Sequence, residues 1–150
     1  MNIDTHYLKG LLGVFKSSNT PFTNINKLKE HGFDHDDDSF LFHMQILEDK
    51  RLVRASTGNG IGYTHTTSGE TAWLTREIRL TSEGHDLASA LERSEVWEII
   101  NNEFDNEGIT VLVKVAIVLS ENFALEKIDA LMTKQNGFQS YSIDMDHGAV

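Results

Sequence analysis

The chain has 150 residues, with 13 Lys and Arg against 23 Asp and Glu, a formal net charge of −10, one proline and no cysteine. A chain of this length can form one hydrophobic core without a disulfide or metal staple, and the lack of cysteine excludes disulfide scaffolds, iron–sulfur clusters and thiol catalysis. No signal-peptide pattern opens the sequence, and no apolar run reaches the roughly 20 residues of a membrane span. We therefore expect an acidic, cytoplasmic domain without membrane contact.

The acidic residues are concentrated in the last third of the chain. Residues 1–54 carry 7 basic and 8 acidic side chains, residues 55–93 carry 3 and 5, and residues 94–150 carry 3 and 10. This distribution predicts two functional surfaces on one domain, or a near-neutral module followed by an acidic helical extension.

Three helices are predicted in the first third. Apolar residues at helical spacing indicate a helix over residues 4–16, with Asp4 as its cap. A short extended piece at 22–24 leads to a short helix over 25–31. The third helix starts at a run of aspartates, where the helix dipole favours carboxylates: Asp36, Asp37 and Asp38.

The next segment has strand character interrupted by glycines. A strand begins at Leu52, residues 56–70 read as a flexible glycine-rich hairpin loop, and strand character resumes over residues 73–80. Thr81 is the expected cap of a further helix. This order of elements is that of a winged helix-turn-helix, so we predict a mainly α fold with a small β-hairpin, with the winged part over residues 1–93.

The C-terminal third is predicted to be helical. One helix begins at Ser94, and a second occupies residues 110–134, either continuous or broken at 120–122. From Thr110 to Leu119 this second helix is apolar on nearly every face, which predicts either a buried core helix or a homodimer interface. Its β-branched content leaves a strand as the alternative. Residues 94–137 would form an extension packed on the winged part, and residues 138–150 a disordered tail.

Three short motifs carry a resemblance to known sequences. They are Phe42-His43-x-x-x-Leu47 before Lys50-Arg51-Leu52, then Leu80-Thr81-x-x-Gly84-His85-x-Leu87, and finally Val96-Trp97. Together they resemble a family of short bacterial and prophage-encoded proteins known as a domain of unknown function, over roughly residues 4–131. The resemblance implies a winged-helix fold and a phage or prophage origin. It implies no activity.

Two groups of residues are candidates for sites of chemistry. Gly84 should lie on the inward face of its helix and allow a close approach. His85 beside it can donate to a backbone carbonyl, and we prefer a structural role to that of a general base because no nucleophile motif accompanies it. His31 and His35 have metal-ligand spacing, but Gly32 interrupts their helix and an acidic helix start explains the aspartates after them. We therefore assign no catalytic, cofactor or metal-binding residue and expect a protein that is not an enzyme.

The predicted function is that of a phage- or prophage-associated regulator that binds DNA weakly. In a winged helix the third helix and the loop after it approach the duplex, although aspartates at the helix start would repel phosphates. The candidate nucleic-acid contacts are Lys27, Lys29, Lys50, Arg51, Arg54 and Arg76. The alternative is an acidic protein-interaction module or nucleic-acid mimic that acts on a host protein. Its candidate contacts are Glu95, Glu98, Glu103, Tyr63 and His65.

Overall fold

The structure, a computed structural model, describes the backbone of residues 1–148 and the side chains of residues 1–135. This part of the chain is mostly helical, with two small antiparallel sheets between the third and fourth helices. The helices are α1 (Thr5–Lys16), α2 (Ile25–Glu30), α3 (Asp38–Asp49), α4 (Ser82–Glu92), α5 (Ser94–Glu103) and α6 (Ile109–Gly148). The strands are β1 (Val53–Ala55), β2 (Tyr63–His65), β3 (Thr71–Trp73) and β4 (Ile78–Leu80).

Side-chain caps fix where the first helices begin. The Asp4 carboxylate accepts the Tyr7 N–H at 3.1 Å at the start of α1, as predicted, and Asn24 caps α2 in the same way. At the start of α3 no side chain caps the helix, so its aspartates act there through charge alone. The apolar faces of these helices meet in one core, whose fully buried side chains include Leu11, Phe40 and Leu47.

A buried histidine joins α3 to the start of α1. His43 is 2% exposed; its Nδ1 donates to the Ser39 carbonyl at 2.7 Å, and its Nε2 accepts the Asp4 backbone N–H at 3.0 Å. Because Nε2 must be unprotonated to accept, the structure needs a neutral imidazole. Burial lowers the pKa of His43 and outweighs the opposite effects of the Ser39 carbonyl and the Asp4 carboxylate.

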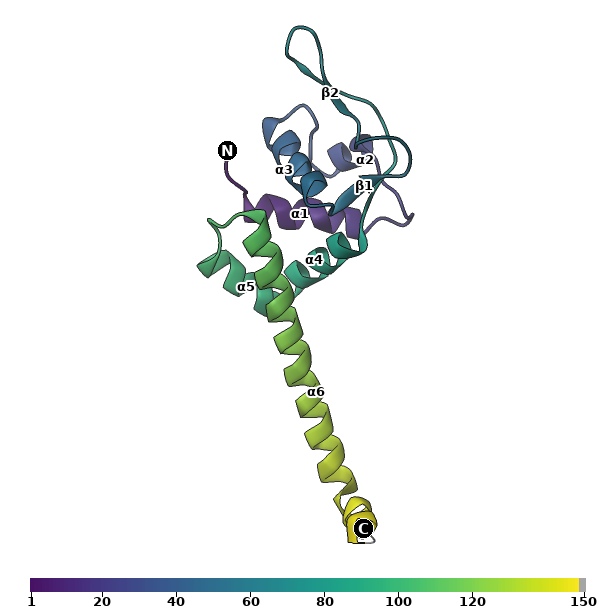
Figure 1. Cartoon of the computed structure of the whole chain (residues 1–150), viewed down its shortest axis with the longest axis vertical. Coiled ribbons are helices and arrows are strands. Elements are labelled where there is room, and N and C mark those ends of the chain that lie inside the picture. Colours follow the sequence, from purple (N-terminus) through teal and green to yellow (C-terminus); the bar gives the residue numbers. More distant parts are fainter. Residues whose placement is uncertain (149–150) are drawn as a thin grey trace.

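The strands of the two sheets lie between α3 and α4 in the sequence. β1 pairs with β4 in the register Val53↔Leu80, and the extended piece at 22–24 adds a bridge between Thr23 and Ile78. The loop between β1 and β4, residues 56–77, is called here the inter-strand loop. It carries its own hairpin, β2 paired with β3, which stands above the rest of the domain in Figure 1.

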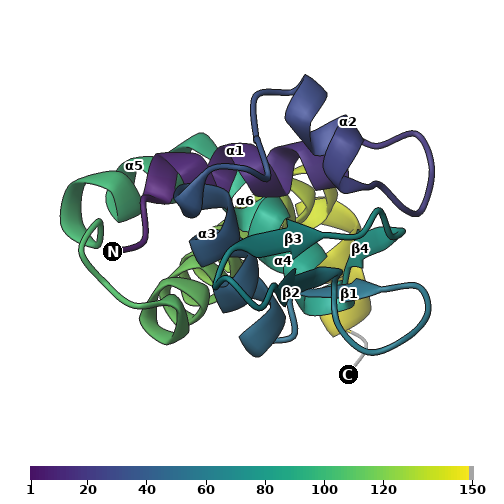
Figure 2. The same cartoon turned by 90° about the horizontal axis from the view of Figure 1, so that it is seen from above.

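This second hairpin corrects the sequence analysis, which predicts one strand over residues 73–80 after a loop without structure. The cause is a tertiary contact: the Trp73 ring packs on Phe40 of α3 and on Tyr63, with centroids 5.2 and 5.4 Å apart. In the view of Figure 2, β3 and β4 are visibly separate strands.

The Leu-Thr-x-x-Gly motif joins α4 to the turn after α3. Thr81 donates its backbone N–H to the Leu52 carbonyl at 2.9 Å and its hydroxyl to the Arg51 carbonyl at 2.7 Å, while its Oγ1 accepts the Gly84 N–H. A Cβ at Gly84 would lie 2.1 Å from the Leu52 oxygen, so the predicted close approach is confirmed. His85 is exposed, and among the described residues its ring makes no hydrogen bond to a backbone carbonyl.

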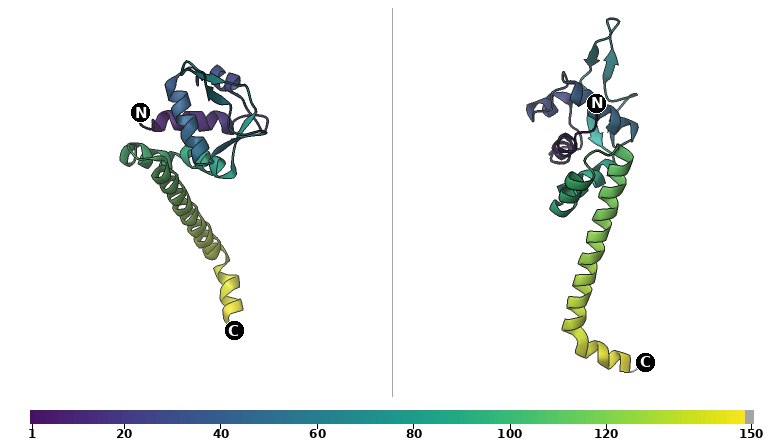
Figure 3. Two further views of the ribbon diagram at one scale, coloured as in Figure 1. Left: turned by 45° about the horizontal axis from the view of Figure 1, so that its top comes forward. Right: turned by 90° about the vertical axis from the view of Figure 1, so that its left-hand side faces the viewer.

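The last two helices pack on α4 and then leave the domain. Leu112 and Ala116 of α6 are buried, whereas Val118 is 43% exposed. The segment from Thr110 to Leu119 is therefore helical and half covered by its own chain, and the helix is continuous through residues 120–122. Figures 1 and 3 show the rest of α6 projecting away from the domain. It continues through most of the segment predicted as a tail, whose residues 149 and 150 lie outside the described residues.

None of the described helices has the length and apolar character needed to cross a membrane.

Candidate nucleic-acid interface

The end of α3 places an arginine in a backbone conformation that normally favours glycine. The Leu52 N–H bonds to the Leu47 carbonyl at 2.8 Å and the Arg51 N–H to the Glu48 carbonyl at 2.9 Å, which is the Schellman pattern of helix termination. This pattern puts Arg51 at φ 56°, the one positive φ outside glycine among the residues that the structure describes. The Thr81 hydroxyl holds the Arg51 carbonyl in place.

Two more arginines lie directly opposite each other on the neighbouring sheet. The antiparallel register pairs Arg54 of β1 with Arg79 of β4, and like charges in such a pair destabilise a sheet. Arg79 donates to the Leu80 carbonyl at 3.0 Å, which leaves its charge uncompensated. We call Lys50, Arg51, Arg54 and Arg79 the cationic corner. Within the described side chains, no carboxylate lies within 4.0 Å of any of these four groups.

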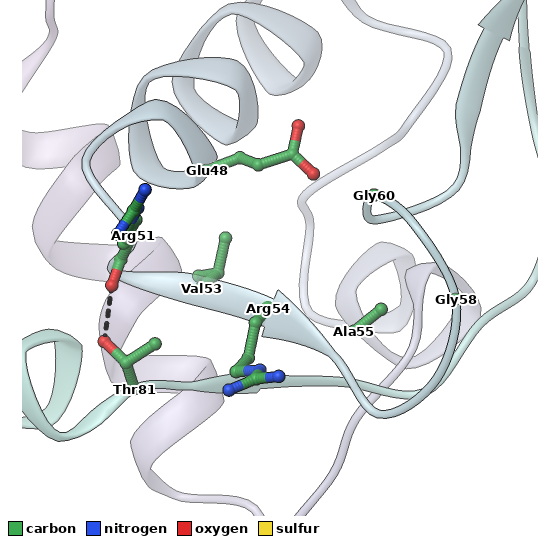
Figure 4. Close-up of a pocket in the computed structure, with 8 residues that line it drawn as sticks. All are labelled: Glu48, Arg51, Val53, Arg54, Ala55, Gly58, Gly60 and Thr81. Carbon is green, nitrogen blue, oxygen red and sulfur yellow. Dashed lines mark hydrogen bonds between the residues drawn. The ribbon is translucent and has the colours of Figure 1, made fainter.

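A pocket of about 410 Å³ opens at this corner (Figure 4). Arg51 and Arg54 line it together with the glycines of the inter-strand loop, and Figure 4 shows the Glu48 carboxylate pointing toward that loop near Gly60. The remaining lining residues are Val53, Ala55, Gly58 and Thr81. The lining of the pocket thus includes two arginines and one carboxylate.

Glu48 does not neutralise the corner because the loop occupies its carboxylate. Its Oε2 accepts the Ile61 N–H at 2.9 Å and its Oε1 accepts the Tyr63 hydroxyl at 3.3 Å. Burial, with a smaller effect of the nearby Glu48 charge, raises the pKa of Tyr63, so the phenol remains a donor at neutral pH. Glu48 thus ties the loop to α3.

Arg76 ties the same loop from the other side. Its Nη1 donates to the carbonyls of Asn59 and Gly60 at 3.2 and 2.9 Å. Arg76 is predicted as a nucleic-acid contact, but the structure gives its guanidinium a positioning task that holds the loop beside the corner.

The remaining basic candidates lie elsewhere. Lys29 on α2 is 3.9 Å from the Asp34 carboxylate, and Lys27 lines a separate pocket of about 260 Å³ between α2 and the end of α1. Of the six predicted contacts, the structure therefore brings together Lys50, Arg51 and Arg54. It adds Arg79, which is not among the predicted contacts and which the strand register places opposite Arg54.

The outer face of α3 has the opposite charge. The helix contains no Lys or Arg, and Asp38 and Asp49 are exposed at its two ends. A helix that reads bases must enter between two phosphate backbones, which this charge opposes.

The predicted protein-contact residues do not form one surface. Glu95 and Glu98 are exposed on α5, with Glu95 3.8 Å from Arg93, while Glu103 stands on the last turn of that helix. Tyr63 and His65 belong to β2, which Figure 1 places at the opposite end of the domain from α5.

No group of three His, Asp or Glu side chains suited to a metal ion occurs among the described residues, and His31 and His35 are not brought together as ligands. Comparisons with protein-family models, curated proteins and solved structures give no significant match to the chain.

Proposed function

We propose that the chain is a non-enzymatic winged helix-turn-helix protein, of phage or prophage type, that binds nucleic-acid phosphates through the cationic corner. In this reading α2 and α3 are the helix-turn-helix, β1 and β4 are the strands of the wing, and the inter-strand loop is the wing itself. The corner contacts the backbone from beside the groove. The acidic face of α3 stays out of the major groove.

The observation that carries the proposal is the basic side chain at Arg51. A non-glycine residue in the left-handed region costs about 1–2 kcal/mol, and glycine is the residue that helices prefer at this position. Backbone outliers of this kind are found where a side chain has a task that outweighs their cost. The opposed pair of Arg54 and Arg79 is a second feature that an anion would stabilise.

Binding should be weak, independent of sequence and strongly dependent on salt. Each phosphate contact adds about −0.9 to the slope of log affinity against log salt concentration, so a corner with three or four cations predicts a slope of about −3 to −4. We would measure fluorescence anisotropy of a labelled short duplex at about 50 mM and about 200 mM salt, the range over which such contacts weaken most.

Three variants test the assignment. R51G removes the cation and places glycine, which adopts a positive φ without strain, at this position. The free energy of unfolding should therefore stay the same or rise by up to about 1 kcal/mol, whereas the affinity for the duplex and the salt slope should fall. R54Q should lower the slope by about another 0.9. K16Q is the matched control, because Lys16 pairs with Glu92 at the end of α4 remote from Thr81.

Cations near the end of α3 also complement the helix dipole, and for this reason the test uses binding and not stability alone. Absence of duplex binding at the lower salt concentration, or equal losses in K16Q and R51G, would remove the proposal.

A second candidate function, an acidic protein-interaction module, is favoured by the charge of α3. Asp38 and Asp49 on α3 and Glu98 on α5 are exposed without a cation within 4.0 Å among the described side chains. Such a face would suit a basic, nucleic-acid-handling host protein. The double variant D38K/D49K should abolish capture of that partner, whereas it should strengthen duplex binding, because it replaces two carboxylates that repel phosphates by two cations.

A further inference from the structure

The distal part of α6 carries a row of exposed apolar side chains that no part of the described chain covers. Val118, Leu125 and Met132 are spaced by seven residues and are 43, 58 and 55% exposed. Ile128 and Leu131, 48 and 50% exposed, widen this row on one side, at about 60° and about 120° around the helix from Leu125. We call these five residues the apolar stripe.

The stripe faces away from the core. Nine residues separate the buried Ala116 from Leu125, which at about 100° per residue places them on opposite sides of the helix. From residue 124 to residue 135 every position is exposed, so this length of α6 has no packing partner. An isolated helix this short is only marginally stable in water, because most helical stability in proteins comes from packing. The projecting half of α6 therefore needs a partner for the stripe.

The proximal half of α6 offers a complementary feature. Between α4 and α6 run two adjoining pockets of about 430 and 350 Å³, which we call the α4–α6 groove. Ile117 lies in both pockets and Val118 in the first, so the groove continues directly into the stripe. Glu83 and Asp86 of α4 line its outer side.

We infer that two copies of this chain associate through α6 in antiparallel orientation. The distal stripe of each copy would lie along the proximal half of the other α6, over the α4–α6 groove. With Leu125 at the two-fold axis, Val118 of one copy meets Met132 of the other. This inference is independent of the nucleic-acid proposal, since it uses none of the residues of the cationic corner.

The charges of α6 fit a second copy better than other partners. Residues 109–135 hold three lysines and three acidic residues, so this segment is neutral although the chain carries −10. A helix that binds an anionic membrane surface is rich in Lys and Arg on its polar face, which this helix is not. A nucleic acid would likewise require a cationic face.

The position of the α4–α6 groove favours the antiparallel orientation. In an antiparallel pair the distal stripe of each copy would cover the α4–α6 groove of the other copy. In a parallel pair the distal halves would meet only each other, and both grooves would remain open.

Mass measurement on the full chain tests the association. Sedimentation equilibrium should give twice the chain mass of 16.9 kDa, with dissociation on dilution. L125E places two charges at the axis and should raise the dissociation constant about 100-fold or more. A130E adds the same charge on the opposite side of the projecting helix and should leave the dimer intact. A wild-type chain that is monomeric at high-micromolar concentration, or a dimer that L125E does not weaken, overturns the inference.

Single cysteines test the orientation, and the chain has none of its own. Under mild oxidation L125C should cross-link to itself, and a mixture of V118C and M132C chains should cross-link to each other. M132C alone should not. Efficient self-cross-linking of M132C would contradict the antiparallel arrangement. Because each variant changes one exposed residue outside the core, far-UV circular dichroism should show an unchanged fold.

Discussion

Replacing Gly84 by alanine gives the most direct test of how α4 is seated on the domain. A Cβ at this position would lie 2.1 Å from the Leu52 carbonyl oxygen and 3.1 Å from its carbon. Since real Cβ contacts are essentially never shorter than 3.0 Å, α4 and the turn after α3 would have to separate by at least 0.9 Å. The atom in the way belongs to the backbone, so no side-chain rotation can relieve the clash.

The expected cost follows from three contributions. Overpacking against a rigid neighbour costs about 3 kcal/mol, the upper end of the usual range. Moving the Leu52 carbonyl weakens its hydrogen bond from the Thr81 N–H, which is worth about 1 kcal/mol. Alanine recovers about 1 kcal/mol of helix propensity relative to glycine. The net loss is about 3 kcal/mol, or about 6–12 °C in Tm for a domain of this size.

Urea and thermal unfolding of G84A and wild type at equal protein concentration would measure this loss. Gly13→Ala is the matched control: it is also inside a helix, but nothing lies within 4 Å of its added Cβ. It should stabilise the protein by up to about 1 kcal/mol. If G84A were as stable as G13A, the contact between α4 and Leu52 would not have the tightness described here, and the reasoning from the motif would fail.

Two further predictions concern His43 and the inter-strand loop. Because the pKa of His43 is lower in the folded chain, the unfolded chain binds the extra proton first as the pH falls. The free energy of unfolding should therefore decrease as the pH drops from about 6.5 through the folded-state pKa. In thermal unfolding between pH 7.5 and 5, H43Q should make this dependence of stability on pH weaker. E48A leaves the buried Ile61 N–H without its acceptor, so it should lower the free energy of unfolding by about 1–3 kcal/mol and speed hydrogen exchange at the Ile61 amide. The control D49A changes the exposed neighbouring residue and should alter neither quantity. Equal exchange at Ile61 in both variants would show that Glu48 does not hold the loop.

The helices were predictable because local signals decide them. Asp4 and Thr81 cap the helices that were expected at these positions, and the glycine of the Leu-Thr-x-x-Gly motif makes the expected close contact. The polar residues Ser120 and Asn122 allow a break in the sequence pattern, but strong helix formers follow them and α6 is continuous there.

The candidate site was predicted only in part, since its geometry depends on contacts between distant residues. Arg79 becomes a neighbour of Arg54 only when β1 and β4 pair, and the register of this pair cannot be predicted from either segment alone. The sequence gives Arg76 as a candidate contact because nothing in it predicts the hydrogen bonds that Arg76 donates to loop carbonyls 16 and 17 residues away. The hairpin of β2 and β3 likewise depends on the packing of Trp73 against α3.

The way the inter-strand loop is fastened divides it into a fixed base and a tip that tolerates change. Glu48 and Arg76 hold residues 59–63, whereas residues 64–72 are all exposed, and the turn at their end closes on itself through the Thr66 N–H to the Glu70 carbonyl. Lengthening such a turn costs little, because loop-closure entropy grows only slowly with loop length. An epitope or a fluorescent peptide inserted after Ser68 should therefore leave folding intact, and would give a handle for detecting the protein in complexes without altering the cationic corner or α6.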